Sequence, residues 1–273
     1  MRAAAVVVAS DLDRTLIFSP RAAARGSARE ARSVEVLDGE VISLLSARTE
    51  QGITELSRRS CFVAVTTRTR AQYERIDLPF SARYAVVACG GVILIDGQPD
   101  PAWSRMVARR LAEQASPLAL LREVLVGYSD RPWFLRLRDA DGLFLVAAVE
   151  ADHLGADQQD EIDASCDAHG WRAVHQGRKL YVLPSGLDKA DAVAHVAERV
   201  GHAGGTLPRV LAAGDTLLDW NMLTAADRAW LPAGSELDRL GMSGAHVTRT
   251  AEPGLAAAEE IVGRWLDLLP AQG

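Results

Sequence analysis

Short apolar runs recur along the chain, and each ends abruptly at polar residues. A run of this length is typical of a strand buried on both faces, as in the middle of a parallel sheet. Segments with helical apolar spacing separate several of the runs, which is the alternation of strands and helices found in α/β folds. The runs predict parallel strands at residues 6–10, 61–65, 84–88 and 209–213, and two further short strands at residues 229–231 and 245–247.

Helices and a hairpin complete this pattern. Alternating residues around Asp38-Gly39 predict a hairpin over residues 34–42, because Asp-Gly is a preferred two-residue turn. Residues 18–32 are rich in Arg, Ala, Ser and Gly without apolar periodicity, and we expect them to form a loop. Apolar residues at helical spacing predict helices at residues 47–59, 189–200 and 255–268.

The pattern changes in the middle of the chain. Alternating segments there predict two antiparallel hairpins accompanied by helices, which is an α+β unit unlike the parallel pattern on either side. The predicted strands cover residues 133–138, 143–149, 172–175 and 179–183, and the predicted helices cover residues 103–114, 118–126 and 156–169. We therefore expect a doubly wound, Rossmann-like parallel sheet core at residues 1–97 and 184–273, with an inserted α+β domain at residues 98–183.

Composition narrows the classes of function. The 273 residues are 48% hydrophobic with a formal net charge of −6, as expected for a globular protein with a substantial core and not for a nucleic-acid-binding surface. No stretch approaches the roughly 18 apolar residues of a membrane span. The three cysteines lack the spacing of a zinc site or a disulfide framework, and the N-terminus lacks a signal-peptide pattern. We expect a cytoplasmic protein that binds neither nucleic acid nor membrane.

The first strand ends in two acidic residues and a threonine, Asp11, Asp13 and Thr15. Carboxylates at the carboxyl end of a parallel strand lie in the crevice where open α/β sheets bind ligands. Two carboxylates at this spacing repel each other unless a cation or a shared proton compensates. Serine, aspartate and threonine also cap helices, so this segment alone is equally compatible with a strand end followed by a helix cap.

Later strand ends and one helix start supply partners for these acids. Thr66 follows the second parallel strand, and Lys189 begins a helix. Asp215 and Asp219 follow a later strand. Carboxylate oxygens are the ligands that Mg²⁺ prefers, and a lysine and a hydroxyl beside them suit the oxygens of a phosphoryl group in transfer. The sequence thus predicts a Mg²⁺-assisted phosphoryl-transfer site at one edge of the sheet.

In this order, the residues form a pattern that resembles the haloacid dehalogenase (HAD) superfamily of phosphohydrolases. Its four motifs correspond to Asp11-Leu12-Asp13-Arg14-Thr15, Thr66, Lys189 and Gly214-Asp215-Thr216-Leu217-Leu218-Asp219. The insertion lies between the second and third motifs, which is the position of a type 2 cap in that superfamily. Its hairpins and helices, and the segment 179–189 that returns to the core, resemble the Cof-like and sucrose-phosphate-phosphatase-like branch.

The resemblance implies a role for each motif residue. Asp11 would be the nucleophile that forms an aspartyl-phosphate, and Asp13 would act as general acid and then as general base. Thr66 and the amide after it would bind the phosphoryl oxygens. Lys189 would offset the charge on Asp11 and on the phosphate. These four residues are the expected catalytic residues.

The resemblance also implies metal ligands and substrate contacts. Mg²⁺ would be held by a carboxylate oxygen of Asp11, the backbone carbonyl of Asp13 and the side chain of Asp215. Asp219 would anchor a metal-bound water or orient Lys189, and it completes the expected metal site. The expected substrate-binding residues are Thr15, Thr67, Arg68 and Arg14.

Some positions depart from the motifs of the superfamily. Arg14 replaces a usual glycine, and Thr67 stands where Thr-Gly-Arg is the commoner pattern. Cys89 stands where Asn-Gly is common, and Leu218 replaces an Asn. None of these changes removes a group that does chemistry. Arg14 could reach the substrate or be a tolerated surface residue, and Arg68 could contact the substrate or form a structural salt bridge.

The implied function is Mg²⁺-dependent hydrolysis of a small phosphorylated metabolite, such as a sugar or polyol phosphate, through an aspartyl-phosphate intermediate. A cap that closes over the site would exclude protein and nucleic-acid substrates. Two alternatives stay open. One is a phosphosugar mutase, which uses the same first motif but keeps the phosphoryl group, and the other is a catalytically idle member that binds or regulates. The sequence determines neither the particular substrate, nor the cap residues that select it, nor the oligomeric state.

Overall fold

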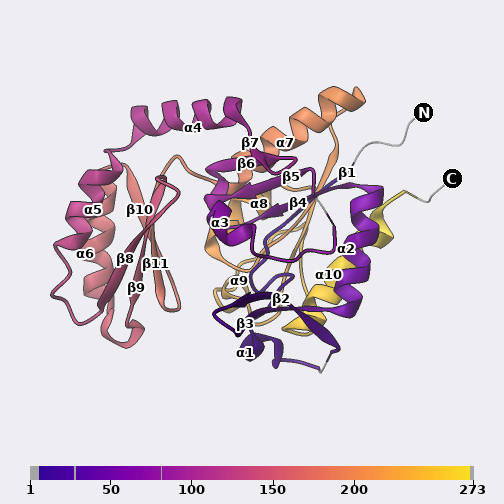
Figure 1. Cartoon of the computed structure of the whole chain (residues 1–273), viewed down its shortest axis with the longest axis horizontal. Coiled ribbons are helices and arrows are strands. Elements are labelled where there is room, and N and C mark those ends of the chain that lie inside the picture. Colours follow the sequence, from indigo (N-terminus) through magenta and orange to yellow (C-terminus); the bar gives the residue numbers. More distant parts are fainter. Residues whose placement is uncertain (1–5, 28, 81, 271–273) are drawn as a thin grey trace. The chain divides into compact units, whose positions relative to one another are not determined.

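The computed structural model of the chain describes residues 6–27, 29–80 and 82–270 (Figure 1). The fold consists of two compact units: the inserted unit, Pro101–Asp188, and the core unit, formed by the described residues before and after it. The insertion expected at residues 98–183 begins and ends a few residues before the inserted unit does. The residues assigned to the core from the sequence that lie outside the described ones are 1–5, 28, 81 and 271–273.

The core unit is built on a mostly parallel sheet with the strand order β14-β13-β12-β1-β4-β5-β6-β7. Its parallel strands are β1 Val6–Ser10, β4 Cys61–Val65, β5 Tyr84–Val87, β12 Arg209–Ala213, β13 Arg228–Leu231 and β14 Val247–Arg249. The antiparallel strands β6 Val92–Ile95 and β7 Gln98–Pro99 extend one edge. The strand order runs outward from β1 in both directions, which creates a switch point between β1 and β12. The predicted doubly wound core is confirmed.

Helices cover both faces of this sheet, which explains why its strands read as continuous apolar runs. All five residues of β1 are buried. Val8 belongs to a core cluster that includes residues of α2 Ala47–Arg59 and α10 Leu255–Leu268. Its neighbours along the strand point to the opposite face, where α7 Lys189–Gly204 contacts β1, β4 and β5. The carboxyl end of β1 therefore lies deep inside the core unit.

A hairpin between β1 and α2 forms a separate two-stranded sheet. Its strands, β2 Ala31–Leu37 and β3 Glu40–Ser46, pair antiparallel. The turn residues Asp38 and Gly39 both have positive φ, 52° and 82°, as a type I′ turn requires. The predicted hairpin is confirmed and extends beyond residues 34–42.

Short helices are the main elements that the sequence did not predict. The unpredicted helices are α1 Pro20–Ala23, α3 Arg70–Tyr73, α8 Trp220–Ala225 and α9 Glu236–Arg239. The prediction of a loop at residues 18–32 is therefore wrong in part, because Ser19 caps α1 there and β2 begins at Ala31.

Among the described helices, none is long and apolar enough to cross a membrane.

The inserted unit is an α+β unit, as predicted. Its antiparallel sheet has the strand order β10-β11-β9-β8. Helix α5 contacts β9, and helix α6 contacts β10. The strands are β8 Phe134–Ala140, β9 Phe144–Val149, β10 Trp171–Gln176 and β11 Lys179–Pro184, and the helices are α4 Pro101–Gln114, α5 Leu118–Val126 and α6 Ala156–Asp167.

Candidate active site

Asp11 directly follows β1, at the switch point of the core sheet. Its N–H donates to the carbonyl oxygen of Ala213 at 2.9 Å, which continues the pairing of β1 with β12 by one residue. Only 4% of the residue is exposed. Its carboxylate accepts hydrogen bonds from Thr15 Oγ1 at 3.3 Å and from Lys189 Nζ at 2.7 Å. Backbone and side-chain contacts together fix the position of this carboxylate.

Lys189 is the first residue of α7, and its side chain is 1% exposed. Its Nζ donates to Asp11 Oδ1 at 2.7 Å and to Asp219 Oδ1 at 2.6 Å. Burial by itself would lower the pKa of Lys189, but the two carboxylates outweigh it and raise that pKa well above the ordinary value. The lysine is therefore held in its charged form between the two acids.

Asp219 organises the loop after β12. Its second oxygen, Oδ2, accepts from the N–H groups of Asp215 and Thr216 at 3.1 and 3.0 Å, and from the Thr216 hydroxyl at 2.9 Å. The loop passes so close to this side chain that a methyl group at Gly214 would collide with it. Asp219 thus holds the loop and the lysine at once, and it exposes none of its surface.

The carboxylates of Asp11, Asp215 and Asp219 form a buried cluster. One oxygen from each lies within 4.8 Å of the other two. Burial raises the pKa of Asp11 to about 7, although Lys189 opposes this. Burial and the charge of Asp11 raise the pKa of Asp215 well above its ordinary value. One lysine does not balance three acids, and their hard oxygen ligands fit a divalent cation such as Mg²⁺.

Asp13 lies outside this cluster and pairs with a different cation. Arg68 Nε and Nη2 donate to the two carboxylate oxygens of Asp13 at 2.7 and 2.8 Å, a bidentate ion pair. The Asp13 side chain is 47% exposed. Burial alone would lower the pKa of Arg68, but Asp13 and Glu35 raise it above its ordinary value. The guanidinium of Arg68, which was expected from the sequence to bind substrate, is therefore paired with carboxylates of the protein.

Glu35 of β2 anchors the far side of Arg68, and the sequence analysis missed it. Its side chain is 1% exposed, and its Oε2 accepts from Arg68 Nη1 at 2.7 Å and from Ser43 Oγ at 3.1 Å. Its other oxygen, Oε1, accepts from Arg75 Nη2 at 3.2 Å. An acid inside the alternating segment 34–42 was the available signal. The β2–β3 hairpin thus sets the position of Arg68 and, through it, of Asp13.

The two threonines after β4 differ in their surroundings. Thr66 is buried, and its N–H donates to the carbonyl oxygen of Val86 at 2.8 Å. Its Oγ1 accepts a hydrogen bond from the N–H of Arg68 at 3.1 Å. Thr67 is half-buried in the same loop. Thr66 therefore shapes the turn that presents Arg68.

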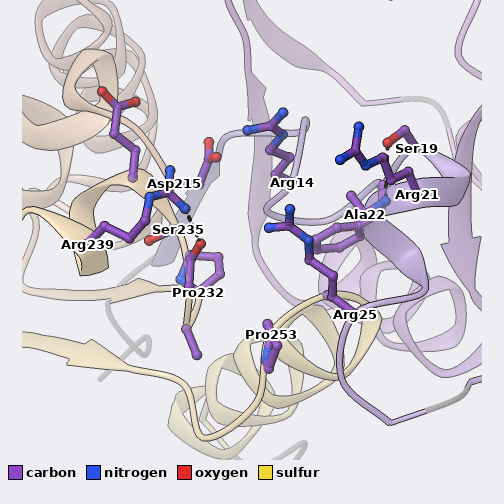
Figure 2. A pocket seen from close by; sticks show the side chains of 15 residues that line it. Arg14, Ser19, Arg21, Ala22, Arg25, Asp215, Pro232, Ser235, Arg239 and Pro253 are labelled. Atoms are coloured by element: carbon purple, nitrogen blue, oxygen red, sulfur yellow. Dashed lines mark hydrogen bonds between the residues drawn. The ribbon is translucent and has the colours of Figure 1, made fainter. Parts of the chain in front are cut away.

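A pocket of about 270 Å³ lies beside the cluster in the core unit (Figure 2). Asp215 belongs both to the cluster and to the lining of this pocket. Arg14, the remaining residue expected to bind substrate, also lines it. The other arginines of its lining, Arg21, Arg25 and Arg239, come from segments that the sequence analysis did not connect with a site.

The structure thus divides the residues expected from the sequence into three groups. Asp11, Thr15, Lys189, Asp215 and Asp219 come together in the buried centre. Asp13 pairs with Arg68, next to Thr66 and Thr67, and Arg14 lines the pocket. The side chain of Asp13 is absent from the acidic cluster found among the described residues.

Comparisons with known proteins bear on the fold. No family model matches the sequence, and no curated protein matches it either. Among solved structures, the sucrose-phosphatase of Synechocystis sp. PCC6803, in complex with sucrose and phosphate, is similar with a TM-score of 0.60 and 14% identity. The match covers 97% of this chain and 98% of that one.

Two further structures give the same picture. A haloacid dehalogenase-like hydrolase from Bacteroides thetaiotaomicron has a TM-score of 0.61 at 13% identity, over 96% of this chain and 99% of that one. The C-terminal domain of trehalose-6-phosphate phosphatase from C. albicans has a TM-score of 0.64 at 12% identity, over 98% of this chain and 94% of that one. The resemblance that the motifs suggested is confirmed at the level of architecture: the chain has the fold of the haloacid dehalogenase-like phosphatases.

Proposed function

We propose that this protein is a Mg²⁺-dependent phosphomonoesterase of the HAD type that acts on a small phosphorylated metabolite, such as a sugar or polyol phosphate. One observation carries the proposal: a buried carboxylate, Asp11, lies at the switch point with a lysine 2.7 Å away and two further acids beside it. The likeness of the fold to solved sugar phosphatases supports the substrate class.

Asp11 is the nucleophile in this proposal. Its carboxylate oxygen forms a bond to phosphorus while the ester P–O bond breaks, which gives an aspartyl-phosphate and an alkoxide. Lys189 orients the carboxylate and offsets the charge that it shares with the phosphoryl group. Water then attacks the phosphorus, the Asp11–phosphate bond breaks, and phosphate leaves.

Asp13 transfers the protons. It donates one to the leaving alkoxide and takes one from the attacking water. The first step needs a proton on one of the two Asp13 oxygens, and both of these oxygens accept hydrogen bonds from Arg68 in the structure. We therefore expect the contacts from Arg68 to loosen when substrate binds.

The acids of the buried centre would hold Mg²⁺. We assign as ligands a carboxylate oxygen of Asp11, the side chain of Asp215 and the backbone carbonyl of Asp13, with Asp219 holding the loop and Lys189 in place. When bound, the ion would neutralise charge on the carboxylates and the phosphoryl oxygens. This also accounts for an excess of buried acids that would otherwise be costly.

The proposed compartment is the cytoplasm. Among the described residues, the three cysteines Cys61, Cys89 and Cys166 form no disulfide bond with one another. Cysteines that are not oxidised to disulfides are typical of proteins in reducing compartments.

The test is phosphate release from a panel of sugar, polyol and nucleotide phosphates, with and without Mg²⁺. We expect turnover that needs Mg²⁺ and that Asp11→Asn abolishes. Asp267→Asn, the same change at an exposed position of α10, is the matched control. Release that survives Asp11→Asn contradicts the mechanism. Conversion of a hexose 1-phosphate to the 6-phosphate, without free phosphate, would identify a mutase instead.

A further inference from the structure

The pocket beside Asp215 is rich in arginine. Figure 2 shows Arg239 on one side of it and Arg14, Arg21 and Arg25 on the other. Arg14 follows Asp13 in the loop after β1, Arg21 and Arg25 lie in and after α1, and Arg239 ends α9. Two acids, Asp215 and Glu236, also line the pocket, so cationic side chains outnumber anionic ones there.

These guanidinium groups are available to a ligand. Among the residues that the structure describes, no carboxylate forms an ion pair with Arg14, Arg21 or Arg25, and Arg239 donates to a backbone carbonyl, that of Gly234, at 2.6 Å. All four residues are exposed, so an anion that enters the pocket meets them without first breaking an ion pair. Planar guanidinium groups bind carboxylates and phosphates through paired hydrogen bonds.

The backbone of Arg14 strengthens this interpretation. Its φ is 64°, in the left-handed region, which favours glycine and is strained for other residues. Arg14 lies between Asp13, which pairs with Arg68, and Thr15, which bonds to Asp11. An arginine at this strained position therefore places a guanidinium at the margin of the reacting centre.

We propose that the pocket binds a second anionic group of the substrate while the phosphoryl group lies at Asp11. The substrate class is then a phosphate ester whose alcohol part carries a carboxylate or a further phosphate, such as a phosphorylated sugar acid or a bisphosphate. This inference rests on the proposed phosphatase function. Asp215, which belongs to both the pocket and the acidic cluster, makes the two sites contiguous.

Matched substrate pairs test the proposal through kcat and KM. Each pair has one neutral and one anionic alcohol part: glycerol 3-phosphate with 3-phosphoglycerate, glucose 6-phosphate with 6-phosphogluconate, and fructose 6-phosphate with fructose 1,6-bisphosphate. The first two pairs test for recognition of a carboxylate, and the third tests for recognition of a phosphate. For the carboxylate pairs, for the phosphate pair or for both, we expect the anionic member to have a kcat/KM at least about tenfold higher than its neutral counterpart, mainly through a lower KM.

Variants of the pocket arginines locate the effect. Arg25→Gln and Arg21→Gln should each reduce the preference for the anionic member about tenfold, with a much smaller effect on the neutral member, and Arg25→Lys should restore part of it. Arg58→Gln, at an exposed position of α2, is the matched control. It changes the net charge by the same amount as the other two glutamine variants, but Arg58 lies outside the pocket lining, so the preference should stay unchanged. Equal use of both members of every pair, or a preference that both glutamine variants leave intact, overturns the proposal.

A binding measurement separates failure of this proposal from failure of the proposed function. Calorimetric titration of the Asp11→Asn protein with 3-phosphoglycerate and with glycerol 3-phosphate reports on the pocket without turnover. Tighter binding of 3-phosphoglycerate that Arg25→Gln removes supports the pocket even if the wild-type protein releases no phosphate. Turnover of neutral esters combined with equal binding of both ligands supports the phosphatase and rejects the anion pocket.

Discussion

Asp11 and Asp13 are two residues apart, yet they occupy opposite kinds of environment. Asp11 is buried, shares a lysine with Asp219, and has its pKa raised to about 7 by that burial. Asp13 is half-exposed and held by an arginine whose other side is fixed by Glu35. The cation for the first acid comes from the start of a helix, and the cation for the second comes from a loop that a hairpin supports.

In the proposed function, these environments suit different tasks of the two carboxylates. A nucleophile benefits from a fixed position and little competing water, and Asp11 is both held by Lys189 and buried. A group that exchanges protons benefits from access to solvent, and the Asp13 side chain is half-exposed. The two environments can be disturbed one at a time, because Lys189 contacts the first acid and Arg68 the second.

The largest effect is expected from Lys189→Met, which removes the cation of the buried side. Asp11 and Asp219 would keep their other hydrogen bonds but would be buried without a cation, so the free energy of unfolding should fall by about 3–5 kcal/mol and phosphate release by about a thousandfold or more. Denaturant unfolding and steady-state kinetics measure these changes. Lys179→Met, at an exposed position of the inserted unit, is the control. Wild-type activity in Lys189→Met would contradict the role given to the lysine.

Glu35→Gln should have a smaller effect on stability and activity, through the contacts that hold Arg68 and Asp13. The change weakens the anchor of Arg68 and leaves a buried group with fewer charged contacts, so stability should fall by about 1–3 kcal/mol and kcat by about tenfold. KM should change little, because Glu35 contacts Arg68, Arg75 and Ser43 in the protein. Glu40→Gln, at the exposed end of β3, is the matched control. An unchanged kcat in Glu35→Gln would mean that the hairpin does not position Asp13.

The stability of the protein should depend on pH through its buried acids. The pKa of Asp11 rises from an ordinary 3.8 to about 7 on folding, so the folded state keeps a proton that the unfolded state loses. The contribution of this proton to the free energy of unfolding is complete below about pH 3.8 and is lost as the pH rises toward 7. The free energy of unfolding should fall over this range by at most about 1.4 kcal/mol per pH unit. The raised pKa of Asp215 acts in the same direction.

Unfolding of the protein in chelator between pH 4 and 8 measures this loss. Asp11→Asn should flatten the decline, and added Mg²⁺ should reduce it, since the ion binds the ionised carboxylates. A decline of the same slope in Asp11→Asn would assign it to other groups.

Arg14→Gly should have the smallest effect on stability, and in the opposite direction. Glycine adopts φ of 64° without strain, so the free energy of unfolding should rise by up to about 1 kcal/mol. Arg14→Ala removes the guanidinium but keeps a residue that is strained at this φ, so it should show no such gain. Equal stability of the two variants would show that the backbone at this position carries no strain.

The residues of the buried cluster around Asp11 were predicted from the sequence, whereas the contacts through which the β2–β3 hairpin holds Asp13 largely were not. Asp11, Lys189 and Asp215 directly follow apolar runs or begin a helix with regular spacing, and these are local signals. The contact of Arg68, in the loop after β4, with Glu35 of β2 joins residues 33 positions apart, and no local pattern records it. Alternation around Asp38-Gly39 predicts the hairpin but not what the hairpin packs against.

The arginine pocket was missed for a related reason. The one-turn helices α1 and α9 have four residues each, which is too short for an apolar period of 3.6 residues to repeat. Their capping residues, Ser19 and Ser235, were the available signals. The pocket arises only where these two segments, far apart in the chain, meet.

The placement of β1 in the sheet has a consequence for synthesis on the ribosome. β4 is made soon after β1, but the other neighbour of β1, β12, and the lysine that faces Asp11 come after the inserted unit; Lys189 is 178 positions beyond Asp11. Among the described strands, those of the inserted unit pair with one another, so its sheet is complete before β12 emerges. A nascent chain at that stage carries an unpaired strand edge and an acid without its cation, and such edges attract chaperones or other chains. The core sheet and the contact of Lys189 with Asp11 can therefore be completed only after the inserted unit has been synthesised.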